Sequence, residues 1–236
     1  MSRHIFLSIP KPPFRIPTKL HFVNMTTRHN PPQGPQASPS PSPPLPSTPV
    51  YFWRETDPDS GFLSQWAASP FPHPADPSLF FRTAEHYMMY RKAALFDPSQ
   101  EAAILAATHP RQVKALGRKV KNFDAATWED QREAIVTEGT RLKFTTGAGA
   151  AERRRRLLAT GTGDLVEASP FDPIWGVGFA PHVAPTVDRE AWGLNLLGKA
   201  LMVVRDELRA AEGRAGGLQT KGGQDAVEEG TSANQQ

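Results

Sequence analysis

The sequence predicts a mainly α-helical protein, with one compact domain of about six to eight helices, a few short β-strands and a disordered tail at each end. Two observations support this prediction. Apolar residues recur at helical spacing through most of residues 50–210, and only short segments have the character of strands. Residues 1–49 and 211–236 show no such periodicity. The domain is therefore predicted to lie between two tails.

The N-terminal segment, residues 1–49, is basic and rich in Pro and Ser. Thirteen of the 24 prolines fall within residues 1–50, which contain no Asp or Glu. Proline interrupts both helix and sheet, so this segment cannot build a packed core. The C-terminal segment, residues 211–236, is polar and rich in Gly. We predict that both are disordered, and that the roughly 160 residues between them suffice for one well-buried core.

Charge and composition exclude several classes of function. The pI of 9.3 reflects the N-terminal segment, because the domain holds 20 basic and 20 acidic residues. A neutral domain is not expected to bind nucleic acid through charge alone. The chain has no Cys, and its seven His residues lack metal-ligand spacing, so neither a disulfide nor a metal site is predicted. No apolar run approaches the roughly 18 residues of a membrane span, and no membrane partner is predicted.

The N-terminal segment also bears on location. It is free of acids and contains Arg and Ser, as mitochondrial presequences do. Four prolines between residues 10 and 17 would interrupt an amphipathic helix there, and a start at Met25 would remove most of the basic residues. A cytoplasmic location is the expectation, with nuclear and mitochondrial locations as alternatives.

The first helices of the domain are marked by their starting residues. Thr83 is a plausible N-cap for a helix from Ala84 to Phe96, with Glu85 in the first turn, where the helix dipole favours negative charge. Pro98 opens a second helix, which ends before Pro110, and a third helix begins at that proline.

The second half of the domain continues the helical pattern. A longer helix follows Asp124, with Trp128, Ile135 and Leu142 seven residues apart on one face. "AAERRRRLLAT" forms the next helix, "DLVEAS" has the apolar centre of a short strand, and "NLLGKALMVVRDELR" is the last helix. Residues 153–156 are consecutive arginines. Each residue turns a helix by about 100°, so they point in four directions and favour a solvated surface over a stripe for nucleic acid.

Five stretches, in this order and spacing, resemble the NADAR family, whose bacterial members are often called YbiA-like. The stretches are "SGFLSQW" (60–66), "TAEHYMMYRKAALF" (83–96), "HPRQVKALGRKV" (109–120), "LVEASPFDPIWGVG" (165–178) and "WGLNLLGKALMVVRDEL" (192–208). The resemblance covers essentially the whole domain and implies a YbiA-like orthogonal helix bundle. Two positions depart from the family pattern: Gln65 stands where Asn is usual, and Leu194 where a polar residue is frequent.

The resemblance implies an N-glycosidase that hydrolyses the N-glycosidic bond of a riboside without a cofactor. The implied substrate is a phosphoribosylamino-pyrimidine of riboflavin synthesis, or ADP-ribose attached to a guanine base. Nucleic acid would then be a partner only as an ADP-ribosylated substrate. The alternative is a non-catalytic module that binds NAD or ADP-ribose. The presence of Glu85, Lys92 and Asp172 together favours the enzyme, because binding alone would tolerate their loss.

Cleavage of a riboside C–N bond needs a carboxylate near the sugar, an acid near the base and a flat surface that holds the base. Glu85 and Lys92 lie two helical turns apart on one face, about 10 Å along the helix. Asp172 follows the short strand in a loop flanked by prolines. We predict that these three residues are catalytic. Lys92 is either an amine nucleophile, favoured by partial desolvation, or a ligand for phosphate.

The remaining predicted site residues are expected to bind the substrate. Trp175 offers a stacking surface and Gly176 allows close approach of the backbone. With these two, the predicted substrate-binding residues are Tyr87, Gln65, Trp66, Glu167 and Asn195. Structural alternatives stay open for several. Glu85 also suits the helix dipole, Asp172 a turn cap and Trp175 the core, and Glu167 is either a second carboxylate facing Lys92 or the partner of an arginine.

Overall fold

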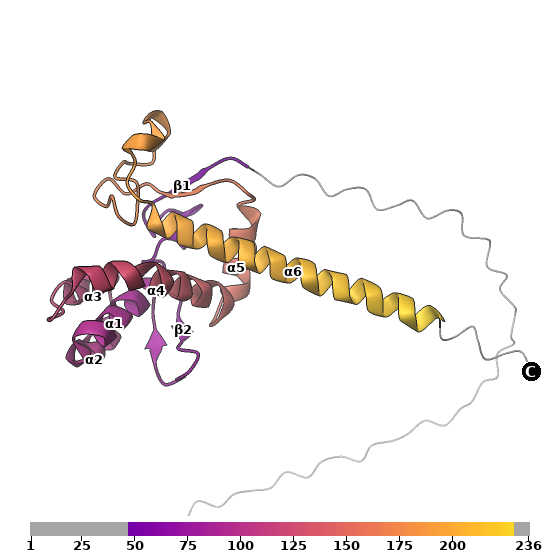
Figure 1. Ribbon diagram of the computed structural model, residues 1–236, viewed down its shortest axis with the longest axis horizontal. Helices are drawn as coiled ribbons and strands as arrows, with labels where there is room; N and C mark the ends of the chain where they lie inside the picture. Colours follow the sequence, from indigo (N-terminus) through magenta and orange to yellow (C-terminus); the bar gives the residue numbers. More distant parts are fainter. Residues whose placement is uncertain (1–46, 229–236) are drawn as a thin grey trace, which may run out of the picture. The chain divides into compact units, whose positions relative to one another are not determined.

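Helices dominate the part of the chain that the computed structural model describes, residues 47–228, with side chains described as far as residue 214. Six α-helices and four short strands are found there (Figure 1). The prediction of a mainly helical domain with a few short strands is confirmed. The predicted disorder of the N-terminal segment concerns residues that lie, except for the last three, outside the described part.

Helix α1 (Ala84–Phe96) occupies the predicted range and lies at the centre of the domain. The Thr83 side chain caps it by accepting a hydrogen bond from the backbone N–H of His86. The His86 ring bonds the Thr83 hydroxyl at 2.8 Å and the Ala107 carbonyl at 3.0 Å. This histidine therefore ties the start of α1 to the segment that follows α2 (Glu101–Ala106).

The next helices also begin where the sequence predicts. Pro98 starts a short 3₁₀ helix, Pro98–Gln100, that leads directly into α2. Helix α3 (Pro110–Gly117) begins at Pro110 and packs against α1. In α4 (Ala125–Thr145) the Asp124 carboxylate caps the first turn by accepting a 2.7 Å hydrogen bond from the Thr127 N–H. Helix α4 then packs on both α1 and α6 (Leu196–Glu228).

Two pairs of strands complete the framework. Strand β1 (Val50–Phe52) pairs in parallel with β4 (Leu165–Glu167), so that Phe52 lies opposite Glu167. Strands β2 (Phe71–Pro72) and β3 (Phe80–Phe81) form a small antiparallel pair. Only β4 was predicted as a specific strand. The others are two or three residues long, too short to show the alternation by which a strand is recognised.

Helix α5 (Ala150–Ala159) carries the four consecutive arginines, and each makes a different contact. Arg153 donates to the Lys143 carbonyl, Arg154 pairs with Glu212, Arg155 pairs with Glu152, and Arg156 donates to the Pro58 and Asp59 carbonyls. The four side chains serve four local contacts, as expected of consecutive residues on a helix.

Helix α6 continues to Glu228, past the predicted end of the domain at residue 210. Its contacts with α5 extend to Glu212, just beyond that position. Arg209 donates a 2.7 Å hydrogen bond to the Gly161 carbonyl, and Glu212 lies 3.2 Å from Arg154. Among the described residues, no helix is both long enough and apolar enough to cross a membrane.

Candidate active site

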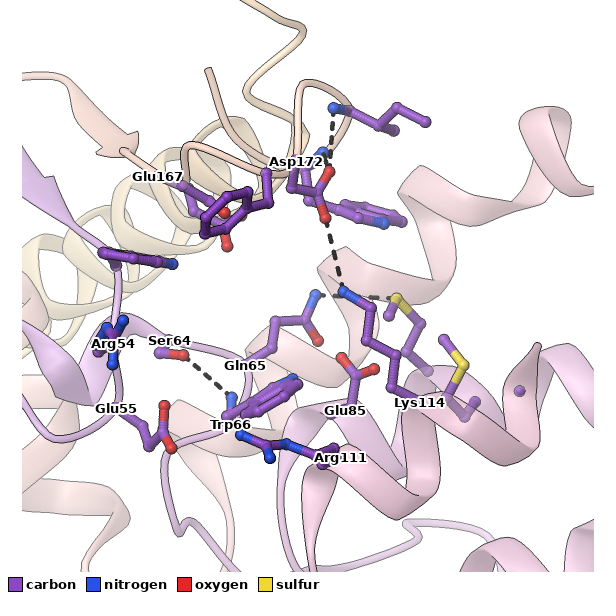
Figure 2. A pocket seen from close by; sticks show the side chains of 18 of the residues that line it. Arg54, Glu55, Ser64, Gln65, Trp66, Glu85, Arg111, Lys114, Glu167 and Asp172 are labelled. Carbon is purple, nitrogen blue, oxygen red and sulfur yellow. Dashed lines mark hydrogen bonds and ion pairs between the residues drawn. The ribbon is translucent and has the colours of Figure 1, made fainter. Parts of the chain in front are cut away.

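A cavity of about 770 Å³ is lined by side chains from segments that are far apart in the sequence (Figure 2). The segment after β1, the turn at residues 64–66, helices α1 and α3, and the loop after β4 all contribute to its walls. The predicted site residues that line it are Gln65, Trp66, Glu85, Lys92, Glu167, Asp172 and Trp175.

Tyr87 is a predicted substrate-binding residue that the structure places in the core instead. Its ring is fully buried, 5.1 Å from the Phe81 ring, and its hydroxyl accepts a 2.6 Å hydrogen bond from Arg91. Tyr87 follows Glu85 by two positions, which turns it about 200° around the helix. The two side chains therefore leave α1 on opposite sides, and the predicted placement of Tyr87 is corrected.

Asn195 and Gly176 do not line the cavity either, but they support its wall. The Asn195 side chain accepts a 3.0 Å hydrogen bond from the Glu167 N–H and donates one of 3.0 Å to the Leu165 carbonyl, so it holds both ends of β4. A Cβ atom at Gly176 would lie 2.4 Å from the Glu167 carbonyl oxygen. The group that approaches Gly176 closely is therefore the backbone of Glu167, where the sequence predicted a ligand.

Four carboxyl groups line the cavity, and three of them, those of Glu85, Glu167 and Asp172, influence one another's pKa or that of a neighbour. Glu85 comes from the first turn of α1, and its N–H donates to the Gln65 carbonyl at 3.1 Å. Glu167 ends β4, and the following loop folds back so that the Val177 N–H bonds the Glu167 carbonyl at 2.9 Å. Asp172 lies in that loop (Figure 2). The fold thus brings together acids from two separate parts of the sequence.

Asp172 caps a turn, which is the structural alternative considered for it, and it also lines the cavity. Its Oδ1 accepts hydrogen bonds from the N–H groups of Ile174 and Trp175, at 3.1 and 2.9 Å, and so caps the turn. Its Oδ2 lies 3.9 Å from Nζ of Lys114 in the cavity. The carboxylate is therefore held in place by backbone donors while it still faces the site.

Glu85 and Glu167 are buried acids with unsatisfied oxygens. Within the described part of the chain, Oε1 of Glu85 and Oε2 of Glu167 have no hydrogen-bond partner. Burial raises the pKa of Glu85 to about 7, partly offset by the charge of Lys114 and by hydrogen bonding from Trp66. Burial and, to a smaller extent, the negative charges of Asp172 and Glu85 together raise the pKa of Glu167 to about 8. An unpaired buried oxygen is costly, which is typical of a site that a ligand completes.

Helix α3 and its C-cap contribute positively charged side chains that were not among the predicted site residues. Arg111, Lys114 and Arg118 follow one another at spacings of three and four and all line the cavity. Such spacing places side chains on one face of a helix, which is a signal that the sequence does contain. Which way that face turns depends on how α3 packs on α1. Within residues 47–214, only Lys114 of the three makes an ion pair.

Lys92 lines the cavity from the far end of α1 and faces aromatic rings. Its Nζ lies 4.2 Å from the centre of the Phe123 ring and 5.5 Å from that of Trp128. Burial lowers its pKa. The lysine charge that acts on Glu85 and Glu167 is that of Lys114. Glu167 and Lys92 line the same cavity, and the interpretation of Glu167 as a second carboxylate facing Lys92 stays a prediction.

Residues 51–209 match the NADAR domain. The protein belongs to the NADAR domain family. An N-glycosidase of Acanthamoeba polyphaga mimivirus is 40% identical over 149 residues, which cover 61% of this chain and 86% of the relative. An N-glycosidase of Nostoc punctiforme is 34% identical over 165 residues, covering 68% of this chain and 92% of the relative.

Two further relatives of this NADAR protein extend the comparison. A riboflavin biosynthesis protein of Vibrio vulnificus is 31% identical over 162 residues, which cover 68% of this chain but 39% of that longer protein. The solved structure of the E. coli protein YbiA is similar with a TM-score of 0.57 and 28% identity, covering 71% of this chain and 89% of YbiA. The YbiA-like fold expected from the sequence is thereby confirmed.

Proposed function

We propose that this NADAR protein is an N-glycosidase that hydrolyses the N-glycosidic bond of a phosphorylated riboside. One observation carries the proposal: two buried carboxyl groups with raised pKa values, Glu85 and Glu167, face one cavity, each with an oxygen that has no hydrogen-bond partner among the residues that the structure describes. Two relatives named as N-glycosidases support it.

The pKa of Glu167 lies above that of Glu85, so Glu167 is the more protonated of the two near neutral pH. Glu167, with a pKa of about 8, keeps its proton and can donate it to the leaving nitrogen. Glu85, with a pKa of about 7, is substantially ionised. Its carboxylate stabilises the positive charge that develops at the anomeric carbon and accepts a proton from the attacking water.

In the proposed step, the bond between the anomeric carbon and nitrogen breaks, and its electron pair stays on the nitrogen, which takes the proton of Glu167. The water oxygen bonds to the anomeric carbon and loses a proton to Glu85. The products are the free base and a phosphorylated ribose. Proton exchange with solvent returns both glutamates to their starting states.

The basic face of α3 supports a phosphorylated substrate. Arg111, Lys114 and Arg118 line one wall, and Arg111 and Arg118 make no ion pair with any residue between 47 and 214. Unpaired guanidinium groups match phosphate oxygens in geometry and charge. The phosphoribosylamino-pyrimidine of riboflavin synthesis is the first substrate to test, since one relative is named as a riboflavin biosynthesis protein. ADP-ribose attached to guanine is the second.

The test is to incubate the full-length protein with each riboside and to monitor the release of free base and free sugar by chromatography. Glu85→Gln and Glu167→Gln keep the shape of each side chain and should each lower turnover by about 10²- to 10⁴-fold. Glu133→Gln, on the exposed side of α4, is the matched control and should change nothing. Tight binding of these ribosides without any release of base would contradict the proposal and favour the alternative of a binding module.

A further inference from the structure

Two aromatic side chains at the cavity, Trp53 and Phe171, are brought together by the pairing of β1 with β4. Phe52 lies opposite Glu167 in the parallel pair, and the Ala168 N–H donates a 2.7 Å hydrogen bond to the Phe52 carbonyl. Because the two strands are parallel, Trp53, which follows β1, lies at the same end of the pair as the loop that follows β4. The ring centres of Trp53 and Phe171 are 6.2 Å apart and tilted by 55°.

Neither ring belongs to the hydrophobic core. Phe171 is 84% exposed, more than any other large apolar side chain in the described part of the chain. The guanidinium of Arg54 lies 4.3 Å from the centre of the Trp53 ring. Burial of a Phe side chain is worth about 1.5–3 kcal/mol, so a phenyl ring left in solvent at a cavity points to a ligand that covers it.

The charged groups give the cavity two different ends. Figure 2 shows Arg54 and Glu55 on the opposite side of the cavity from Lys114, with Glu85 beside Lys114 and with Glu167 and Asp172 along the upper wall. Arg54 marks the end with the Trp53 ring, and Lys114 marks the end formed by α3. Glu167 lies toward the end with Trp53, because it pairs with Phe52, the residue that precedes Trp53. Asp172 lies toward the α3 end, where it pairs with Lys114.

We propose that Trp53 and Phe171 form a clamp that holds the planar leaving base, and that this clamp sets the direction in which the substrate binds. The inference rests on the proposed N-glycosidase function. The base lies against the ends of β1 and β4 beside Glu167, and the phosphate lies against α3. The base stacks on one ring face while the other ring meets its edge, and aromatic groups favour both arrangements.

Trp175, the stacking surface predicted from the sequence, lines the cavity and is also packed against protein. It is half-buried and packs against the main core cluster, and its backbone N–H donates a hydrogen bond to Oδ1 of Asp172. One side of Trp175 is thus occupied by protein. Trp53 and Phe171 have no such packing, and they are the aromatic groups at the Glu167 end that a base can cover without displacing core residues.

Binding of two probes, adenosine 5′-monophosphate and ribose 5-phosphate, tests the clamp by calorimetry on the full chain. The wild type should bind the nucleotide more tightly than the sugar phosphate by about 5- to 150-fold, the range expected for stacking of one base. Phe171→Ala should remove most of this preference while leaving the affinity for ribose 5-phosphate unchanged. Phe171→Tyr keeps a flat ring and should retain the preference.

Phe80→Ala is the matched control, because Phe80 is another exposed phenylalanine, in β3, that does not line the cavity. It should bind both probes as the wild type does. Equal affinity of the wild type for the two probes would overturn the clamp, as would an unchanged preference in Phe171→Ala. Neither measurement needs turnover, so a chain that binds with this preference and fails to hydrolyse ribosides would refute the proposed function and leave the clamp standing.

Discussion

The negative charge of Glu85 raises the pKa of Glu167, although the two residues belong to helix α1 and strand β4. Both carboxyls face the same cavity and both are buried, so ionisation of one makes ionisation of the other more costly. Their protons are therefore released in two steps that belong to the pair. Between these steps one glutamate is protonated and one is ionised, which is the state that the proposed reaction uses.

We expect a bell-shaped dependence of kcat/KM on pH, with its maximum between about pH 7 and 8. Below the pKa of Glu85, about 7, protonation removes the carboxylate that accepts a proton from water. Above the pKa of Glu167, about 8, the general acid loses its proton. Initial rates from pH 5.5 to 9.5 measure both limbs. Glu167→Gln should abolish the alkaline limb, and a flat wild-type profile would contradict these roles.

Lys114→Met should move the acid limb of the same profile to higher pH. The charge of Lys114 lowers the pKa of both Glu85 and Glu167, so its removal raises both values. The variant would then need a higher pH to ionise Glu85. Lys119→Met removes an exposed lysine two residues beyond α3 that does not line the cavity, and its profile should match the wild type. Equal profiles for the two variants would show that Lys114 does not tune the acids.

Lys92→Met should lower kcat/KM by 10-fold or more with little change in Tm. Lys92 lines the cavity and makes no ion pair or hydrogen bond with any residue between 47 and 214, so its loss removes a charge that faces the ligand without breaking a polar contact within the protein. Methionine preserves most of the length and the apolar contact with Phe123. Thermal unfolding and steady-state rates measure the two effects, and a large fall in Tm with unchanged rates would assign Lys92 to the fold.

Lys92→Arg separates the two roles that the sequence left open for this lysine. Arginine keeps the positive charge but stays protonated, so it cannot form an imine. Retained activity is the expected result for a side chain that binds an anion. Loss of activity, together with a covalent adduct on the wild type after borohydride treatment during turnover, is the expected result for an amine nucleophile.

Gly139→Ala should destabilise the protein by about 1–3 kcal/mol, the usual cost of overpacking a core. A Cβ atom there would lie 2.7 Å from the Tyr87 ring, which is fully buried and cannot move aside. Gly213→Ala is the matched control, because a Cβ atom in that part of α6 meets nothing within 4 Å. It should stabilise the helix by up to about 1 kcal/mol. Urea unfolding of both variants compares the two effects.

Local signals in the sequence were sufficient for the helices and for part of the site. Capping by Thr83 and Asp124 and the proline starts at Pro98 and Pro110 involve only neighbouring residues, and the structure shows each of them. The faces of a helix are likewise set by its period, which is why Glu85 and Lys92 share the cavity.

Tertiary structure alone decided what the helix faces meet. The helical period of α1 also turns Tyr87 away from Glu85. Only the packing of Tyr87 against Phe81 shows that this face of α1 belongs to the hydrophobic core. Arg111, Lys114 and Arg118 share a face by spacing, and the packing of α3 on α1 directs that face into the cavity. The parallel pairing of β1 with β4 sets Phe52 opposite Glu167, more than a hundred residues away in the sequence, and so brings Trp53 and Phe171 to the same end of the two strands. Such contacts follow from global burial and strand pairing, which no short window of sequence encodes.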